Sequence, residues 1–98
     1  MSSGPNLDRF LHAIADPTRR RILLALKEKG GASIEKETGL CAADIEHRVK
    51  LAQPTVSHHM RILEKAGLVE AGRVGHWRWY RRNEKLIAEM MRGLKGQL

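Results

Sequence analysis

The stretch QPTVSHHMRILEKAGLV, residues 53–69, decides the fold of this chain. Its apolar residues recur at spacings of four and three, which places them on one face of a helix: Val56, Met60 and Leu63. Pro54 suits the first turn of that helix, where a backbone N–H would lack a partner in any case. Gly67 ends it. The stretch therefore predicts an amphipathic helix over residues 54–66, after a tight connection at residues 51–53.

The N-terminal part of the chain predicts two helices. The first covers residues 7–14, and its apolar residues share one stripe: Leu7, Phe10, Leu11 and Ile14. The second begins at Asp16-Pro17, a good N-cap followed by a good first helical residue, and ends at Gly30-Gly31. Its apolar face consists of Ile22, Leu23, Ala25 and Leu26.

Between these helices and the opening stretch, the sequence is polar and then apolar again. Residues 30–40 contain glycine and predict a loop, with a short helical turn at residues 34–38. Ile45 and Val49 stand four residues apart, so residues 41–50 predict a short third helix.

After Gly67 the apolar pattern changes from a helical to an alternating period. Residues 68–71 and 77–82 predict two strands, and the glycines within residues 72–76 predict the turn between them. Asn83 is a suitable N-cap for a final helix. The broad apolar face of that helix consists of Leu86, Ile87, Met90, Met91 and Leu94.

The predicted order is α-α-α-α-β-β-α. A short helix, a tight turn, a second helix and a basic hairpin together form a winged helix-turn-helix, a mainly α fold with a small β-hairpin. With 98 residues the chain has room for one small domain, which we expect to span residues 1–98 with residues 1–6 flexible.

The charge of the chain favours polyanionic partners. The formal net charge is +7, which points to nucleic acid first and to an anionic membrane surface second. No apolar run is long enough for a transmembrane helix, and the N-terminus lacks the pattern of a signal peptide, so we expect a cytoplasmic protein. Cys41, the single cysteine, cannot form a disulfide within the chain.

The opening stretch also carries side chains suited to DNA. Major-groove readout uses side chains at the start of one helix, and glutamine, serine, threonine and arginine bind base edges or phosphates. The residues predicted to face DNA from this helix are Gln53, Pro54, Thr55, Ser57, His58 and Arg61. The predicted hairpin adds cations that can clamp phosphates or enter a minor groove: Arg73, His76 and Arg78.

Two pairs of ring side chains have alternative interpretations. Trp77 and Trp79 share one strand face, where they either stack on bases as in single-strand binders or pack beneath the wing. Packing is favoured because the chain has few aromatic residues. Adjacent helical residues point about 100° apart, so His58 and His59 are unsuited to sharing one metal ion. We expect His59 to face the neighbouring helix and His58 to face DNA.

These motifs resemble those of ArsR/SmtB-type bacterial repressors. The resemblance rests on ADPTRRRIL (residues 15–23), on the opening stretch and on GHWRWYR (residues 75–81), and it extends over residues 7–95. The chain departs from the family pattern at three positions of the helix-turn-helix. Glu46 and Lys50 replace the usual alanine and glycine, and Ala52 replaces a capping serine.

The resemblance implies a homodimer that binds a palindromic operator and represses transcription until an inducer releases it. The dimer would form through the first and last helices, whose apolar faces agree with this arrangement. The predicted interface residues are Leu7, Phe10, Leu11, Ile14, Ile87, Met90, Met91 and Leu94.

The resemblance also raises the question of a metal effector. Cys41 and Asp44 match the family's Cys-x-x-Asp pattern, and His12 could add a nitrogen ligand for zinc. These are three donors where a tetrahedral site needs four, so a buried structural cysteine is the favoured alternative. The last helix has neither histidine nor cysteine, and a site built from several thiols is excluded within one chain.

Two other classes of function compete with transcriptional regulation. An enzyme is disfavoured because Ser57 and His58 are adjacent rather than opposed, and no third group orients them. A winged helix can also bind protein or RNA without recognising an operator, because a fold does not fix a function.

Overall fold

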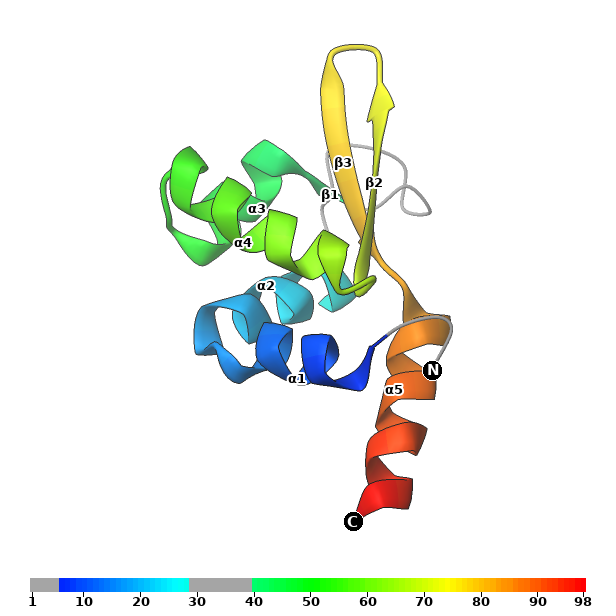
Figure 1. The fold of residues 1–98 in the computed structure, drawn as a ribbon. Helices are drawn as coiled ribbons and strands as arrows, with labels where there is room; N and C mark the ends of the chain where they lie inside the picture. Colours follow the sequence, from blue (N-terminus) through cyan, green and yellow to red (C-terminus); the bar gives the residue numbers. More distant parts are fainter. Residues whose placement is uncertain (1–5, 29–39) are drawn as a thin grey trace.

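The computed structural model describes residues 6–28 and 40–98. Their elements are α1 (Leu7–Ala15), α2 (Pro17–Glu28), β1 (Leu40–Cys41), α3 (Ala42–Val49), α4 (Gln53–Lys65), β2 (Val69–Val74), β3 (Trp77–Arg82) and α5 (Glu84–Gln97) (Figure 1). The predicted winged helix-turn-helix is confirmed, and β1 is an addition to the predicted order. The predicted turn at residues 34–38, the glycine stop at Gly30-Gly31 and most of the expected flexible N-terminus lie outside the described residues.

The helices α1 to α4 pack together, while the β2–β3 hairpin and α5 project from opposite ends of this helical body (Figure 1). The core lies where these elements meet. Its largest fully buried side chains include Ile22, Leu40, Ile45, Met60, Leu63 and Leu68. Every apolar position predicted to face inward from α3 and α4 is buried.

A small antiparallel sheet joins the wing to the helical body. Its strand order is β1-β3-β2, with Leu40 opposite Tyr80 and Ala71 opposite Tyr80 from the other side. The strand β1 was not predicted, because two residues are too few to show an alternating pattern. Its pairing with β3 places Cys41 at the N-cap of α3.

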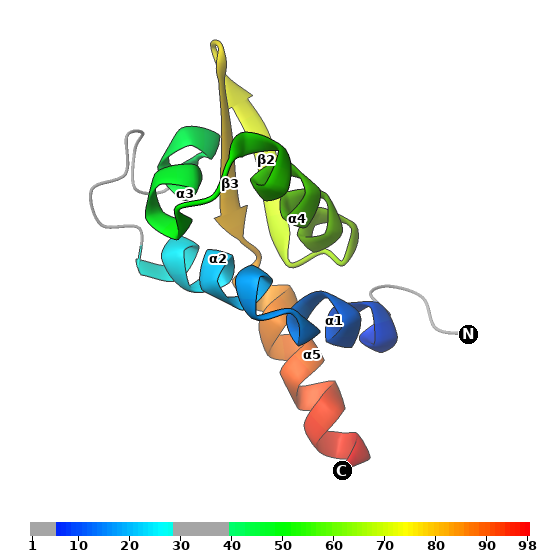
Figure 2. The same cartoon turned by 90° about the vertical axis from the view of Figure 1, so that its left-hand side faces the viewer.

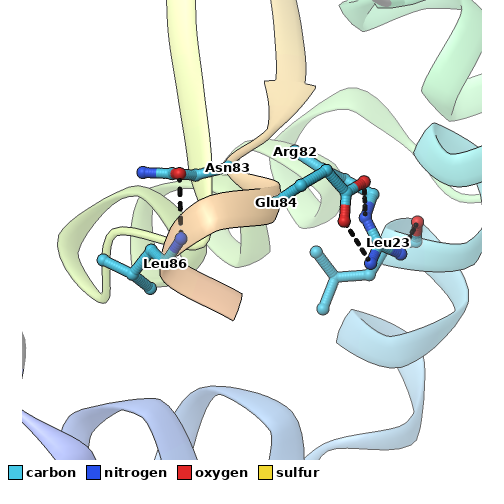
Figure 3. A network of polar contacts seen from close by, with 5 residues as sticks. All are labelled: Leu23, Arg82, Asn83, Glu84 and Leu86. Carbon is cyan, nitrogen blue, oxygen red and sulfur yellow. Dashed lines mark hydrogen bonds and ion pairs between the residues drawn. The ribbon is translucent and has the colours of Figure 1, made fainter. Parts of the chain in front are cut away.

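Side-chain caps start three of the helices, two of them as predicted. Asp16 Oδ2 accepts the Arg19 backbone N–H at 3.0 Å, and Asn83 Oδ1 accepts that of Leu86 at 3.1 Å (Figure 3). The Asn6 side chain accepts the Arg9 backbone N–H at the start of α1. Hydrogen bonding from the Arg19 backbone N–H is the main cause that lowers the pKa of Asp16. These caps fix where α1, α2 and α5 begin.

Arg82 fixes the direction in which α5 leaves the domain. Its Nη1 donates to the Leu23 carbonyl of α2 at 3.3 Å, and its Nη2 donates to Glu84 Oε1 at 3.1 Å (Figure 3). Arg82 Nε lies 2.8 Å from Glu84 Oε2 as an ion pair, although its N–H is not aligned for a hydrogen bond. One guanidinium therefore ties the end of β3 to α2 and to the first turn of α5.

Lys50 adopts a left-handed conformation between α3 and α4. Its φ is 59° and its ψ 46°, and its N–H donates to the Glu46 carbonyl at 2.8 Å. A non-glycine residue in this conformation costs roughly 1–2 kcal/mol. The turn thus keeps the geometry for which glycine is suited, despite the lysine.

We expect Lys50→Gly to raise the free energy of unfolding by about 1 kcal/mol, because glycine relieves the left-handed strain while adding some entropy to the unfolded chain. Urea denaturation measures this change. Lys50→Ala is the matched control, since it removes the charge but keeps the Cβ, and it should show no such gain. Equal stabilities of the two variants would contradict the prediction.

Candidate nucleic-acid interface

The helix-turn-helix presents α4 along one side of the molecule. Figure 2 shows α3 and α4 joined by a short turn, with the hairpin rising beyond them. Val56, Met60 and Leu63 of α4 are buried. The residues predicted to face DNA lie on the remaining sides of α4, where all are exposed except the half-buried Ser57: Gln53, Pro54, Thr55, Ser57, His58 and Arg61.

A hydrogen bond organises the first turn of α4. Gln53 Nε2 donates to Ser57 Oγ at 2.9 Å, one helical turn further on. The contact uses one N–H of the Gln53 carboxamide, which leaves its second N–H and its oxygen for a ligand. An adenine edge requires one donor and one acceptor of this kind. Gln53 and Ser57 therefore act as one preorganised polar unit.

Arg61 extends the polar side of α4 by one turn. It is exposed, and within the described part of the chain it forms no ion pair and no hydrogen bond. A guanidinium without a protein partner keeps all its donors for a phosphate or a guanine.

Cations are concentrated in the wing, but they have different surroundings. Arg73 and His76 are exposed near the turn, which Gly75 makes possible with a φ of 60°. Arg73 stands directly opposite Arg78 in the β2–β3 register. Like charges at such a pair are unfavourable without an anion, so this end of the wing suits a polyanionic partner.

Arg78 connects the wing to α4, a role that its position in the sequence did not reveal. Its Nε donates to the Tyr80 hydroxyl at 2.8 Å, and its Nη2 lies 3.6 Å from Glu64 Oε1. The hydrogen bond to Tyr80 is the main cause that raises the pKa of Arg78. Since Glu64 belongs to α4, Arg78 helps set the angle between the wing and the helix, while about half of its side chain stays accessible.

The two tryptophans differ, and the prediction that both pack beneath the wing is wrong for Trp77. Trp77 is 55% exposed, because it lies next to the turn, where none of the described helices covers it. Trp79 is half-buried and packs against Gly72, and the Arg81 guanidinium lies 5.4 Å from its ring centroid. Packing therefore describes Trp79 only.

Gly72→Ala is expected to destabilise the protein by roughly 1–3 kcal/mol, the usual cost of overpacking. A Cβ at Gly72 would stand 2.4 Å from Trp79 Cζ2, so the indole has to move. Thermal unfolding measures the loss, and tryptophan emission reports the displaced ring. In a Trp79→Leu background the same change should cost much less; an equal cost in both backgrounds would contradict this contact.

His59 faces a neighbouring helix, as predicted, and His58 does not share its surroundings. His59 is half-buried and its Nδ1 is 3.2 Å from Arg19 Nη1 of α2, whereas His58 is exposed. Their ring centroids are 5.2 Å apart. The two rings therefore serve different surfaces, one inside the domain and one on the side proposed for DNA.

The candidate metal ligands are only partly brought together. Cys41 is buried, and its Sγ lies 3.3 Å from Asp44 Oδ2. His12 is exposed on α1 and does not join them. In residues 6–28 and 40–98, no three or more histidine, cysteine, aspartate or glutamate side chains form a group that could hold a metal ion.

The predicted dimer surface lies on α1 and α5, with one exception. Phe10 is 2% exposed and belongs to the core of the subunit, so it has almost no surface left for a partner. The other predicted interface residues are half-buried, apart from the 51% exposed Met91: Leu7, Leu11, Ile14, Ile87, Met90, Met91 and Leu94. An open groove of about 250 Å³ lies between α1, α2 and α5, with Ile14 and Met91 among its lining residues.

None of the described helices combines the length and the apolar character that a membrane-spanning helix needs.

Comparison with known proteins agrees with this geometry. The family model of bacterial regulatory proteins of the arsR family matches residues 16–71. An uncharacterized HTH-type transcriptional regulator of Methanocaldococcus jannaschii is 43% identical over 68 residues, which is 69% of this chain and 67% of the relative. The transcriptional repressor SdpR of Bacillus subtilis is 32% identical over 83 residues, covering 85% of this chain and 82% of SdpR.

A solved structure is similar over nearly the whole chain. The homodimeric winged helix-turn-helix DNA-binding domain of a possible ArsR-family transcriptional regulator from Mycobacterium bovis aligns with a TM-score of 0.68 and 25% identity. The alignment covers 91% of this chain and 74% of that one. The matched family model and these relatives, together with the exposed polar side of α4 and the basic wing, identify this chain as a DNA-binding transcriptional regulator of the ArsR family.

Proposed function

We propose that this regulator is a cytoplasmic, homodimeric repressor that binds a palindromic operator, with α4 in the major groove and the wing on the adjacent backbone. The observation that carries the proposal is the division of α4 into two sides. One side is anchored in the core by Val56, Met60 and Leu63, and the other presents polar and cationic side chains. A rigidly held helix with a polar outer side is what groove readout requires.

The roles of the individual side chains follow from their chemistry. Near the start of α4, the residues suited to base edges are Gln53, Thr55, Ser57 and His58. Arg61 and the wing residues Arg73 and His76 are suited to phosphates, where their charge supplies affinity without sequence information. Arg78 combines a contact to DNA with its link to Glu64.

Dimerisation is supported by the shape of the subunit. α5 projects beyond the helical body (Figure 1). Its apolar residues Ile87, Met90, Met91 and Leu94 are incompletely covered within the subunit. The groove between α1, α2 and α5 continues this surface. The related Mycobacterium bovis domain is described as homodimeric. A second copy of the chain would cover the surface and place two α4 helices one DNA turn apart.

The residues of the described chain do not fit a tetrahedral zinc effector site. Cys41 and Asp44 supply two donors, His12 lies elsewhere, and four are needed. We therefore propose that an effector releases the DNA, as the resemblance implies, and we assign that role to no metal ion.

Selection from a random DNA pool tests the proposed function. Duplexes enriched by the wild-type protein are expected to share a palindrome with two half-sites about ten base pairs apart, and to bind far more tightly than scrambled duplexes at physiological salt. Equal affinity for enriched and scrambled duplexes would contradict the repressor proposal. It would favour the alternative of a winged helix that binds protein or RNA.

A further inference from the structure

Arg19 of α2 is the most deeply buried charged side chain that the structure describes, and its guanidinium has partners on two other helices, α1 and α4. It is 6% exposed. Its Nε donates to the Ala13 carbonyl at 2.6 Å and its Nη2 to the His12 carbonyl at 3.0 Å. Both carbonyls belong to the last turns of α1, where no further helical N–H is available to them. The Arg19 side chain, which belongs to α2, therefore caps the C-terminal end of α1.

The remaining arm of the same guanidinium reaches α4. Arg19 Nη1 lies 3.2 Å from His59 Nδ1. Because a guanidinium has only donors, His59 Nδ1 must be the acceptor, and the imidazole must be neutral with its hydrogen on Nε2. A second proton on His59 would turn this hydrogen bond into a contact between two cations.

The surroundings of His59 oppose that second proton. Burial is the main cause that lowers the pKa of His59, and the charges of Arg19 and His58 lower it further. Asp16, at the junction of α1 and α2, acts in the opposite direction. The unfolded chain takes up the proton at a higher pH than the folded chain, so the contribution of the pair is present above about pH 6.5 and is lost as the pH falls below it.

We propose that Arg19 and His59 are a positioning pair that holds α4 at a fixed place against α1, so that protonation of His59 weakens operator binding. The proposal rests on the proposed function, in which α4 reads DNA and α1 forms part of the dimer interface. Within a dimer, the pair would link the surface that sets the spacing of the two subunits to the helix that reads each half-site. It would thereby set the placement of both reading helices on the operator.

The direction of the pH effect distinguishes this proposal from simple electrostatics. Extra positive charge on a DNA-binding surface normally strengthens binding. Protonation of His59 is expected to do the reverse, because it removes a contact that positions α4. The relevant quantity is therefore the affinity of the wild type relative to a variant in which residue 59 cannot take up a proton.

The test compares the wild type with His59→Asn between about pH 7.5 and about pH 5.5, using a duplex enriched by the wild type. Asparagine places an oxygen acceptor near the position of Nδ1 and does not titrate. We expect the two affinities to agree within about twofold at the higher pH, and the wild type to lose roughly fivefold relative to His59→Asn at the lower pH, as for one lost hydrogen bond. A constant ratio, or a relative gain by the wild type, would overturn the proposal.

Two further variants separate positioning from a general effect of substitution. His47→Asn is the matched control, with the same change at an exposed histidine of α3, and relative to His59→Asn it should lose affinity at the lower pH as the wild type does. His59→Phe keeps a ring but has no acceptor, so it should bind DNA more weakly at both pH values, with the fold confirmed by circular dichroism. Wild-type affinity of His59→Phe at the higher pH would also overturn the proposal.

A measurement without DNA distinguishes failure of the pair from failure of the proposed function. Nitrogen-15 chemical shifts of the imidazole should show His59 neutral with its hydrogen on Nε2 at the higher pH. A hydrogen on Nδ1 would overturn the pair itself. If the shifts agree, specific DNA binding with a constant affinity ratio overturns only the coupling, whereas the absence of specific binding at either pH overturns the proposed function and the coupling with it.

Discussion

A Met91→Glu protein is expected to be monomeric and to bind operator DNA on the order of 100-fold more weakly than the wild type. Met91 is 51% exposed on α5 and lines the groove between α1, α2 and α5. Burying an unpaired carboxylate in an apolar interface is strongly unfavourable. Once the dimer is lost, each half-site is bound separately, and the gain from joining two binding modules disappears. Analytical ultracentrifugation and a DNA-binding titration measure the two effects.

Ala88→Glu is the matched control for the loss of dimerisation. Ala88 is exposed on the same helix, does not line the groove, and glutamate is well tolerated in helices. This variant should remain dimeric and keep its affinity for DNA. A dimeric Met91→Glu protein would show that subunits associate through another surface.

Arg61→Ala is expected to weaken operator binding by roughly 1–3 kcal/mol, which corresponds to a factor of about 5 to about 150. Arg61 is exposed on the side of α4 that faces away from the core, without an ion pair in the described part of the chain. If it contacts a phosphate, the dependence of the logarithm of affinity on the logarithm of salt concentration should become shallower by about one. Titrations at several salt concentrations measure both quantities.

Lys65→Ala is the matched control, because it removes the same charge from the last turn of α4. The Lys65 backbone carbonyl accepts a hydrogen bond from Arg9 of α1, and the substitution leaves that carbonyl in place. This end of the helix lies away from Gln53 and Thr55, so its charge contributes only to the general field of the protein. The variant should lose much less affinity than Arg61→Ala. Equal losses would indicate that Arg61 also acts only through net charge.

Local patterns in the sequence were enough to predict the helices of the described chain, the wing and the side of α4 that faces outward. Helical periodicity places Val56, Met60 and Leu63 on one side whatever packs against them, and the opposite side is then determined. The Asp16 and Asn83 caps were equally predictable, because a cap bonds to a backbone group only three residues away.

Contacts between distant segments were not predictable from these patterns. Phe10 and Leu7 share one apolar stripe of α1, but only the packing of α1 against its neighbours places Phe10 in the core. Trp77 and Trp79 share one strand face, so alternation predicts the same burial for both. Their burial differs because Gly72 on the neighbouring strand β2 leaves room for the Trp79 ring.

The sequence by itself thus determined which surfaces this protein has: a polar side of α4, a basic wing and an apolar face on α1 and α5. Only the tertiary structure decided how these surfaces are held relative to one another. Arg78 of the wing meets Glu64 of α4, and Arg19 meets His59 forty positions further along the chain. The physical reason is that periodicity fixes the direction of a side chain within its own element, whereas its partner depends on how the elements pack.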